Sequence, residues 1–581
     1  MTDRKELLQA IQAKKQEMKI LQKRIIQMSR AYNSTSLASA LPSDILFLIF
    51  REYLRYPTLK TTRIDPWILM RRPGEIEEIA VPYDSRFLYD PIEENPPHSR
   101  WLVLAGVCHT WQTVLLSSPL LWSRIEASIF RRPDLLEKFI WNSYNAPLDI
   151  HITDASFINF IGQADILRDS VKRIMEEDIH LKSLYLVFSL SGFQYFLLAY
   201  RITFSLSRLQ SLDIRLDHSQ VDDMYVSRPV LGFPAFMEAN FQSLRHVALT
   251  DVYAEWKSLS TLPSTVTDLY ITNRLQPSLI GPMNDVLDVL KKLVNLQKLA
   301  LYDCLPPSTG RLTGLVHLLK LEKLTIAGDI TRVMSLFDCL EHPPTTEICV
   351  GLDVHPGQEI HTASLSVLSR IRRIYEGHSD QIGASICVDR GYASVSLSAD
   401  TVQHHELFLK LTGTSDDTQF SPLNLLCGAL EAATARLFSF VTNLWLAILD
   451  HHTHDAPRLL SLVFQTFSRV ESMSIEGQVT TLIEALRPKQ DNPILLPELY
   501  RLCLAETKIV EDTGTEHLGI LSGDTLYSCL KERKDHDCGL AILEFDDACT
   551  IHISAADEFR DRLETAVGNI KGWEEGLSCK D

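Results

Sequence analysis

The feature that most constrains the fold of this chain is a recurring set of three apolar residues spaced LxxLxL. Ten segments carry it: LKSLYL (181–186), LQSLDI (209–214), LRHVAL (244–249), VTDLYI (266–271), LQKLAL (296–301), LEKLTI (321–326), VTNLWL (441–446), VESMSI (470–475), LYRLCL (499–504) and LAILEF (540–545). Two weaker matches, TTEICV (345–350) and YASVSL (392–397), fall between them. Such alternation predicts a short strand with one buried face at each match.

The segments between these strands have helical periodicity, for example NDVLDVLKKLVN (284–295). Successive matches start 22 to 35 residues apart in the first block, and the starts at 441, 470 and 499 are each 29 apart. One strand and one helix per repeat of this length are typical of a leucine-rich-repeat solenoid, a horseshoe of short parallel strands and helices in which stacked units share one core. The sequence therefore predicts an α/β fold with a degenerate solenoid over 128–565. The Asn that usually follows the third apolar position is absent.

In a solenoid of this kind the strand positions between and beside the apolar residues point to the concave face, the usual recognition surface. Each such residue taken alone is more often plain surface than a binding hot spot. The expected target-binding face consists of Tyr185, Asp213, Arg215, His246, Tyr270, Lys298, Tyr302, Lys323, Trp445, Glu476, Arg501 and Glu544.

Residues 3–32 contain no Gly or Pro and predict a helix. A heptad frame places Ile11, Met18, Ile25 and Tyr32 at one core position and Leu7, Leu21 and Met28 at the other, with Lys14 interrupting the second series. The pattern fits a short coiled coil with weak self-association, or an amphipathic helix docked on the body. Residues 1–30 hold eight Lys or Arg against three Asp or Glu, a local charge of +5.

A small-residue linker, NSTSLASA (33–40), leads to LPSDILFLIFREYLR, where Pro42 predicts a helix start. Residues 56–99 are rich in proline and carry mixed charge, including Glu77, Glu78, Glu93 and Glu94, which is typical of a solvated, irregular insertion. A second helix is expected over about 101–117, followed by a Pro-marked turn and a third apolar segment in SSPLLWSRI.

Residues suited to chemistry do not form a recognised motif. His404 and His405, and the cluster of His451, His452, His454 and Asp455, offer metal ligands, but without a recognised spacing and in an expected loop. Cys529 and Cys538 are interpreted as ordinary thiols around a turn. Phosphate-binding loops, nucleophile elbows and HExxH pairs are absent from the sequence. We therefore expect no catalytic, cofactor or metal site, and a protein that is not an enzyme.

The net charge of −17 argues against a general nucleic-acid binder, because phosphate binding needs concentrated Lys and Arg. No apolar run reaches the roughly 18–20 residues of a membrane span. The eleven cysteines are scattered with no CxxC pair, and the N-terminus lacks a secretory signal, so reduced intracellular thiols are expected. The expected location is cytoplasmic or nuclear.

The stretches LPSDILFLIFREYL (41–54) and LAGVCHTWQTVLLSSPLLW (104–122) resemble the F-box, a three-helix module with Leu-Pro, a helix ending near Ile-Phe, then Val-Cys-x-x-Trp and Leu-Trp. With the N-terminal helix and the degenerate repeats, the chain is similar to the large F-box-like families of mushroom-forming fungi. Its closing LYSCLKERKDHDCGLAILEFDDAC (526–549) is similar to their last repeat. It departs from the F-box pattern in the long insertion and in His109, where Arg is common.

The resemblance implies a substrate-recognition subunit of a cullin-type ubiquitin ligase, which docks on a Skp-type adaptor and binds an unknown target protein through its repeats. It implies that these residues pack the module or contact the adaptor: Leu41, Pro42, Ile45, Leu46, Ile49, Phe50, Val107, Cys108, Trp111, Leu121 and Trp122. The alternative is a stand-alone interaction scaffold in which the module only caps the solenoid. The expected domains are the helix at 1–33, the module at 37–127, the solenoid at 128–565 and a tail at 566–581.

Overall fold

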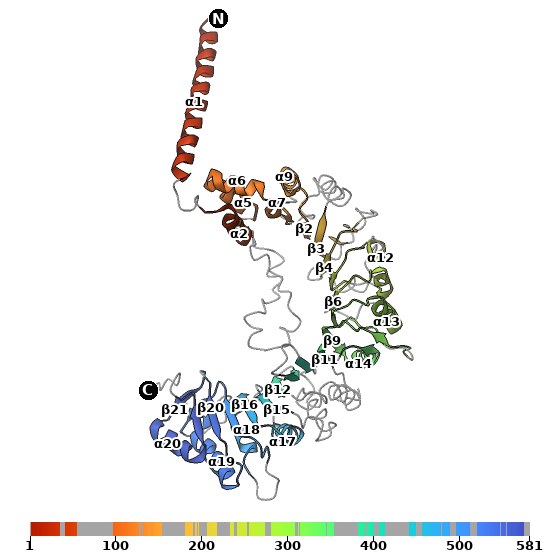
Figure 1. Ribbon diagram of the computed structural model, residues 1–581, viewed down its shortest axis with the longest axis vertical. Helices are drawn as coiled ribbons and strands as arrows, with labels where there is room; N and C mark the ends of the chain where they lie inside the picture. Colours follow the sequence, from red (N-terminus) through yellow and green to blue (C-terminus); the bar gives the residue numbers. More distant parts are fainter. Residues whose placement is uncertain are drawn as a thin grey trace. The chain divides into compact units, whose positions relative to one another are not determined.

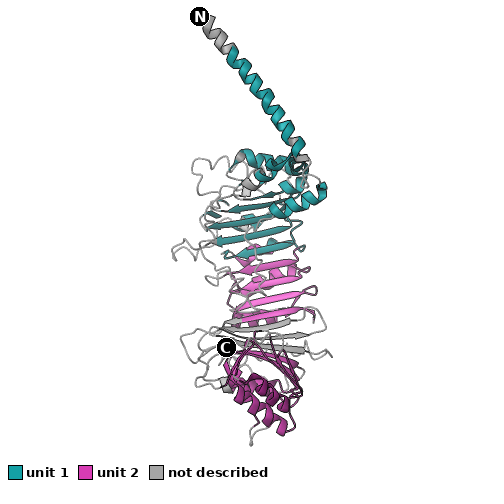
Figure 2. Ribbon diagram, turned by 90° about the vertical axis from the view of Figure 1, so that its left-hand side faces the viewer, with its two compact units in different colours: residues 1–254, 261–265 teal, residues 255–260, 266–581 magenta. Residues whose placement is uncertain are grey.

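The computed structural model describes residues 2–34, 41–54, 97–126, 129, 132–153, 180–189, 192–193, 196, 206–217, 233–237, 241–252, 255–273, 281–307, 312, 314–343, 345–353, 382–389, 392–399, 406–412, 441–448, 456–477, 479–488, 495–511, 520–546, 548–553 and 555–573 (Figure 1). The chain divides into two compact units (Figure 2). Unit 1 holds residues 1–254 and 261–265, and unit 2 holds residues 255–260 and 266–581. This division falls inside the segment in which the sequence predicts one continuous repeat array.

Unit 1 begins with helix α1 (Thr2–Ser34), which agrees with the helix predicted over 3–32. All side chains described between residues 10 and 29 are exposed, including those of the heptad positions Ile11, Met18 and Ile25. An amphipathic helix docked on the body of the chain would bury these side chains. The exposed side chains do not fit that interpretation.

The next helices among the described residues are α2 (Ser43–Leu54), α5 (Pro97–Val107), α6 (His109–Ser117) and α7 (Pro119–Trp122). The prediction of a single helix over 101–117 is wrong at Cys108, which has an extended backbone (φ −159°, ψ 169°). The Cys108 Sγ accepts a hydrogen bond from the Trp111 backbone N–H at 3.5 Å, so the residue caps a new helix instead of continuing the old one. Pro119 starts α7, where its missing N–H costs no hydrogen bond.

The sheet of unit 1 consists of β1 (Arg124–Ile125), β2 (Leu148–Thr153), β3 (Leu181–Ser189), β4 (Ser211–Asp217) and β5 (His246–Thr250). Neighbours in the sequence pair side by side and in parallel. Helix α9 (Pro133–Ser143) lies between β1 and β2 in the chain, and α12 (Phe233–Met237) between β4 and β5. Buried and half-exposed side chains alternate along the strands, as the sequence pattern predicts.

Unit 2 begins with the same arrangement. After the 3₁₀ helix η5 (Trp256–Thr261) come β6 (Asp268–Thr272), α13 (Met283–Lys292), β7 (Lys298–Tyr302), β9 (Lys323–Asp329), α14 (Ile330–Asp338) and β11 (Glu347–Asp353). Its strands β6, β7, β9 and β11 pair in this order and in parallel. Two short strands, β8 (Val316–His317) and β10 (Leu340–Glu341), form a separate parallel pair.

A meander then interrupts the repeat. It consists of β12 (Ile382–Asp389), β13 (Tyr392–Ala399) and β14 (Glu406–Thr412), which lie in reversed order, with β14 beside β11 and β12 beside β15 (Val441–Ile448). Strand β13 is antiparallel to both of its neighbours. The weak match YASVSL is therefore a strand but not a repeat unit, and the sequence pattern missed β12 and β14.

After the meander the parallel order resumes with β15, β16 (Ser472–Gly477), β17 (Arg501–Leu504), β20 (Ile542–Phe545) and β22 (Asn569–Lys571). The helices between them are α17 (Ala456–Thr466), α18 (Val479–Ala485), α19 (Gly523–Asp535) and α20 (Ala556–Ala566). A second, three-stranded parallel sheet contains β18 (Lys508–Val510), β19 (Ile520–Ser522) and β21 (Thr550–His552).

The last strand extends the fold beyond residue 565, where the sequence suggested a tail. Strand β22 pairs with β20, and the Trp573 ring packs against Phe545 at 5.6 Å and Phe559 at 6.2 Å between centroids. Gly572 is needed at this point, since its φ is +74° and a Cβ there would lie 2.0 Å from the Phe545 carbonyl oxygen.

In all ten LxxLxL segments the three apolar side chains are buried. Six segments share a further apolar residue three positions upstream, whose carbonyl accepts from the N–H of the first apolar residue: Leu206, Phe241, Leu293, Leu318, Phe467 and Leu496. The position two residues after the last apolar residue has a positive φ in five of the ten segments: Asp251, Asp303, Gly328, Gly477 and Glu506. The fold is a mixed α/β structure with a largely parallel sheet in each unit.

Candidate functional site: an apolar helical face and a polar strand face

Four of the residues assigned by resemblance lie in the core of the helical module. Leu46 and Phe50 are 0% exposed, and Leu121 and Trp122 are also buried. Phe50 meets the half-buried Trp111 edge-on with ring centroids 5.0 Å apart. The Trp122 Nε1–H donates to the Leu115 carbonyl at 2.8 Å. These side chains hold α2, α6 and α7 together and are not available for direct contact with a partner.

Five other assigned residues are exposed: Leu41, Pro42, Ile45, Ile49 and Val107. Ile45 and Ile49 are spaced by four, so they lie on one side of α2, and they are 40% and 43% exposed. The sequence assignment missed Leu48, Tyr53 and Val103, which are exposed as well. The spacing of 45, 49 and 53 could have revealed Tyr53. We call the following residues the exposed apolar set: Leu41, Ile45, Leu48, Ile49, Tyr53, Val103 and Val107.

Aromatic packing joins the module to the first strand-and-helix unit of the sheet. The Trp101 and Trp122 rings lie 4.4 Å apart, and each is within 5.1 Å of the Phe139 ring of α9. The Ser123 carbonyl, directly after α7, accepts from the Asp149 N–H of β2 at 2.9 Å. The module is therefore built onto one end of the unit 1 sheet.

All twelve residues expected on the target-binding face are half-buried and point to the sheet face opposite the buried leucines. In unit 1 the register sets Tyr185 beside Asp213 and places His246 at the level of Ser211. The other members belong to unit 2: Tyr270, Lys298, Tyr302, Lys323, Trp445, Glu476, Arg501 and Glu544.

Polar and aromatic side chains on neighbouring strands of unit 1 form what we call the Tyr185 cluster: His151, Tyr185, Asp213 and Arg215. Arg215 donates from Nε and a terminal nitrogen to the two Asp213 carboxylate oxygens at 3.2 and 3.1 Å. The Arg215 guanidinium carbon also lies 5.1 Å from the centroid of the Tyr185 ring, and the His151 ring lies 5.0 Å from it. The cluster presents a fixed guanidinium and two rings, a combination enriched at protein interfaces.

Sequence reasoning missed His151, because LDIHIT (148–153) lacks the LxxLxL spacing. Burial, followed by the positive charge of Arg124, lowers the pKa of His151 to about 4. The imidazole is therefore neutral at neutral pH, where it offers one donor and one acceptor rather than a charge.

Charged residues form a row across unit 2 at one level of the sheet. The register aligns Asp268, Lys298, Lys323 and Glu347 on β6, β7, β9 and β11. Lys298 pairs with Asp268 at 3.8 Å, and Lys323 pairs with Glu347 at 2.9 Å. Further along, Arg501 donates from Nε to Glu544 at 2.9 Å. These pairs neutralise one another across neighbouring strands.

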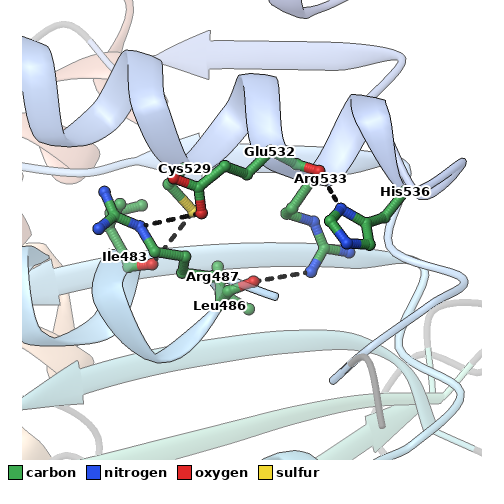
Figure 3. Close-up of polar contacts among 7 residues, drawn as sticks. All are labelled: Ile483, Leu486, Arg487, Cys529, Glu532, Arg533 and His536. Carbon is green, nitrogen blue, oxygen red and sulfur yellow. Dashed lines mark hydrogen bonds and ion pairs between the residues drawn. The ribbon is translucent and has the colours of Figure 1, made fainter. Parts of the chain in front are cut away.

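A buried cation lies among the last helices (Figure 3). Arg533 of α19 is 1% exposed and donates to the carbonyls of Leu486, Leu495 and Leu496 at 3.1, 3.0 and 2.8 Å. Burial lowers the pKa of this guanidinium. Leu496 has a φ of +51°, so Arg533 holds a strained turn in place.

Two cysteines near this cation, Cys529 and Cys538, have buried thiol groups. The Cys529 thiol donates to the Ile483 carbonyl at 3.2 Å, and the Cys538 thiol donates to the Arg533 carbonyl at 3.1 Å. The histidine candidates, His404, His405, His451, His452 and His454, with Asp455, lie outside the described residues. Within the described ranges, no group of three or more His, Cys, Asp or Glu is arranged to hold a metal ion.

No helix in the described part of the chain combines the length and the hydrophobicity needed to cross a bilayer. No family model matches the chain, and neither does any curated protein.

Proposed function

We propose that this chain is the substrate-recognition subunit of a cullin-type ubiquitin ligase, in the cytoplasm or nucleus. Its F-box-like module docks on a Skp-type adaptor, and a degenerate leucine-rich-repeat solenoid binds a target protein. The exposed apolar set carries this proposal. A helix that buries Leu46 and Phe50 while leaving Ile45 and Ile49 exposed presents apolar anchors that a partner groove can cover.

The chain itself then performs no bond chemistry. Its effect is to hold the target near the transfer machinery, so that an encounter between separate molecules becomes an intramolecular one at high effective concentration. The Tyr185 cluster is the best candidate for the first target contact, because Asp213 fixes the Arg215 guanidinium beside the Tyr185 ring before binding.

Co-purification of the full chain with a Skp-type adaptor tests the docking step. We expect the chain to retain the adaptor, Ile45→Asp/Ile49→Asp to lose it, and Leu41→Ala/Pro42→Ala to weaken it. The matched control is Leu319→Asp, which also puts a carboxylate at an exposed apolar position, but in unit 2. Absence of the adaptor from the unaltered chain, or equal loss in the control, would rule the proposal out.

Target binding has a separate readout. Proteins that co-purify with the chain and persist in the Ile45→Asp/Ile49→Asp variant are candidate targets. We expect Arg215→Ala to lose such a protein while retaining the adaptor. Loss of both partners together would show that the variant is misfolded, which circular dichroism checks directly.

The second candidate function is a stand-alone scaffold in which the module only caps the repeats. The packing of Trp101 and Trp122 on Phe139 favours it, because a terminal repeat needs a cover for its apolar face. Under this alternative, Phe139→Ala exposes both the module and the sheet to protease. The unaltered chain then retains no Skp-type adaptor.

A further inference from the structure

Helix α1 presents an apolar seam whose described members are all exposed. Heptad position a holds Ile11, Met18 and Ile25, and position d holds Leu21 and Met28. These five side chains are 45% to 73% exposed. At 1.5 Å per residue the 33-residue helix is about 50 Å long. An exposed seam repeated over this length is what a second helix covers in a coiled coil.

A parallel, in-register pairing of two copies is disfavoured by charge. It would place the two Lys14 ammonium groups against each other at position d, inside the seam. The flanking g and e positions would set Glu17 against Gln22 and Arg24 against Ser29, so no opposite charges meet across the pair. The local charge of +5 would then repel without compensation.

The antiparallel arrangement removes these conflicts. With Met18 of one copy against Leu21 of the other, Ile11 meets Met28, and Ile25 meets Lys14, whose long stem can pack while its ammonium reaches water. Position g then faces position g, so Glu17 of each copy lies opposite Arg24 of the other. Two complementary ion pairs form by symmetry, and nearly the whole helix overlaps.

We propose that α1 is a self-association element that pairs antiparallel with α1 of a second copy of this chain, with Glu17 and Arg24 setting the direction. The proposal is independent of adaptor docking. Within one copy, Glu17 accepts an ion pair from Lys14 at 2.7 Å, but both side chains are more than half exposed, so the carboxylate remains accessible to Arg24 of the partner.

The test is the mass of the full-length chain by analytical ultracentrifugation over a range of concentrations. We expect a monomer–dimer equilibrium that Leu21→Asp abolishes, because this change places a carboxylate against Met18 of the other copy. Glu17→Arg should weaken the dimer about tenfold, because two exposed ion pairs become two repulsions. Arg24→Glu should do the same, and an equimolar mixture of these two variants should restore dimerisation. Lys23→Glu, a charge reversal at the outward position f, is the matched control with no weakening.

Restoration in the mixture is the signature of the antiparallel register, since a parallel pair never brings positions 17 and 24 together. A chain that stays monomeric overturns the proposal. So does a dimer that survives Leu21→Asp, which would use another surface. A dimer lost in Leu21→Asp but unchanged in Glu17→Arg would be parallel and would overturn the direction proposed here. The substitutions change exposed residues outside the core, so unaltered thermal unfolding confirms that each variant is folded.

Discussion

Two groups of helices differ in how much apolar side-chain surface they expose. One is the helical module of α2, α5, α6 and α7, and the other is α19 and α20 near the C-terminus. Both cover strands at an end of a parallel series. The module leaves a whole set of large apolar side chains exposed, among them Ile45, Leu48 and Ile49. Between residues 501 and 573, no described large apolar side chain is exposed, and even the cation Arg533 is buried. The described part of the C-terminal helices exposes polar side chains only, whereas the module exposes an apolar surface.

The largest expected effect comes from the core of the module. Phe50→Ala removes a fully buried ring that contacts Trp111, and should lower the free energy of unfolding of the module by about 3–5 kcal/mol. Denaturant unfolding followed by tryptophan fluorescence measures it. A loss below about 1 kcal/mol would mean that the module core is loosely packed, and the contrast with the C-terminal helices would then disappear.

The corresponding substitution in the C-terminal helices is Arg533→Met. It leaves three carbonyls without their donor and should cost about 3 kcal/mol of unfolding free energy, at roughly 1 kcal/mol per hydrogen bond. Arg533→Lys is the control. It keeps the positive charge but not the several N–H donors of the guanidinium, and should recover only part of the lost unfolding free energy. Full recovery by Lys would show that charge, not geometry, holds the turn at Leu496.

A smaller effect is expected at the junction of module and sheet. Trp122→Phe keeps an aromatic ring near Trp101 and Phe139 but leaves the Leu115 carbonyl without the indole N–H, at a cost of about 1–2 kcal/mol. The same denaturant titration measures it. An unchanged denaturant midpoint would mean that ring packing alone stabilises this junction.

The exposed apolar set should be almost neutral for stability. Ile45→Ser/Ile49→Ser should change the unfolding free energy by less than about 0.5 kcal/mol and should raise solubility, because these side chains meet water in the isolated chain. Sedimentation after salt precipitation measures the solubility. Destabilisation comparable to that of Phe50→Ala would mean that these residues are packed, and would break the comparison between the two ends.

The reactivity of two thiols tests the difference between the helical module and the C-terminal helices, and it needs no substitution. Cys529 is buried, and burial raises its pKa to about 11, so at pH 8 it should resist alkylation in the folded chain while the half-buried Cys108 reacts. Mass spectrometry after timed iodoacetamide treatment measures both rates. The unfolded thiol has the lower pKa, so above about pH 9 it loses its proton first, and this residue makes stability fall as pH rises toward 11. Equal rates at Cys529 and Cys108 would contradict the burial of Cys529.

The comparison also shows which predictions from sequence succeed. The LxxLxL spacing predicted ten strands correctly, because each buried triplet is a local pattern that any stacked parallel strand must satisfy. The break at Cys108 was missed, because a thiol that caps a helix has no pattern distinct from a thiol inside one. The reversed order of β12, β13 and β14 was missed too, since strand alternation carries no information on direction.

The candidate functional surfaces were also predicted only in part from the sequence. The sequence named Ile45 and Ile49 together with Leu46 and Phe50, and the direction of each side chain from α2 decided which pair is core and which is surface. It named Tyr185, Asp213 and Arg215 as separate positions on one face. Only the parallel register joined them with His151, which lies on a strand that the repeat pattern did not include.

By itself, then, the sequence determined the positions of the repeats, the heptad seam of α1 and the absence of familiar catalytic motifs, because periodicity and spacing are properties of the chain read in order. The tertiary structure decided which apolar residues remain uncovered, where the sheet reverses, and how Arg533 is satisfied by three carbonyls. Those outcomes depend on which segments distant in sequence become neighbours, and packing between such segments is not encoded in any one of them.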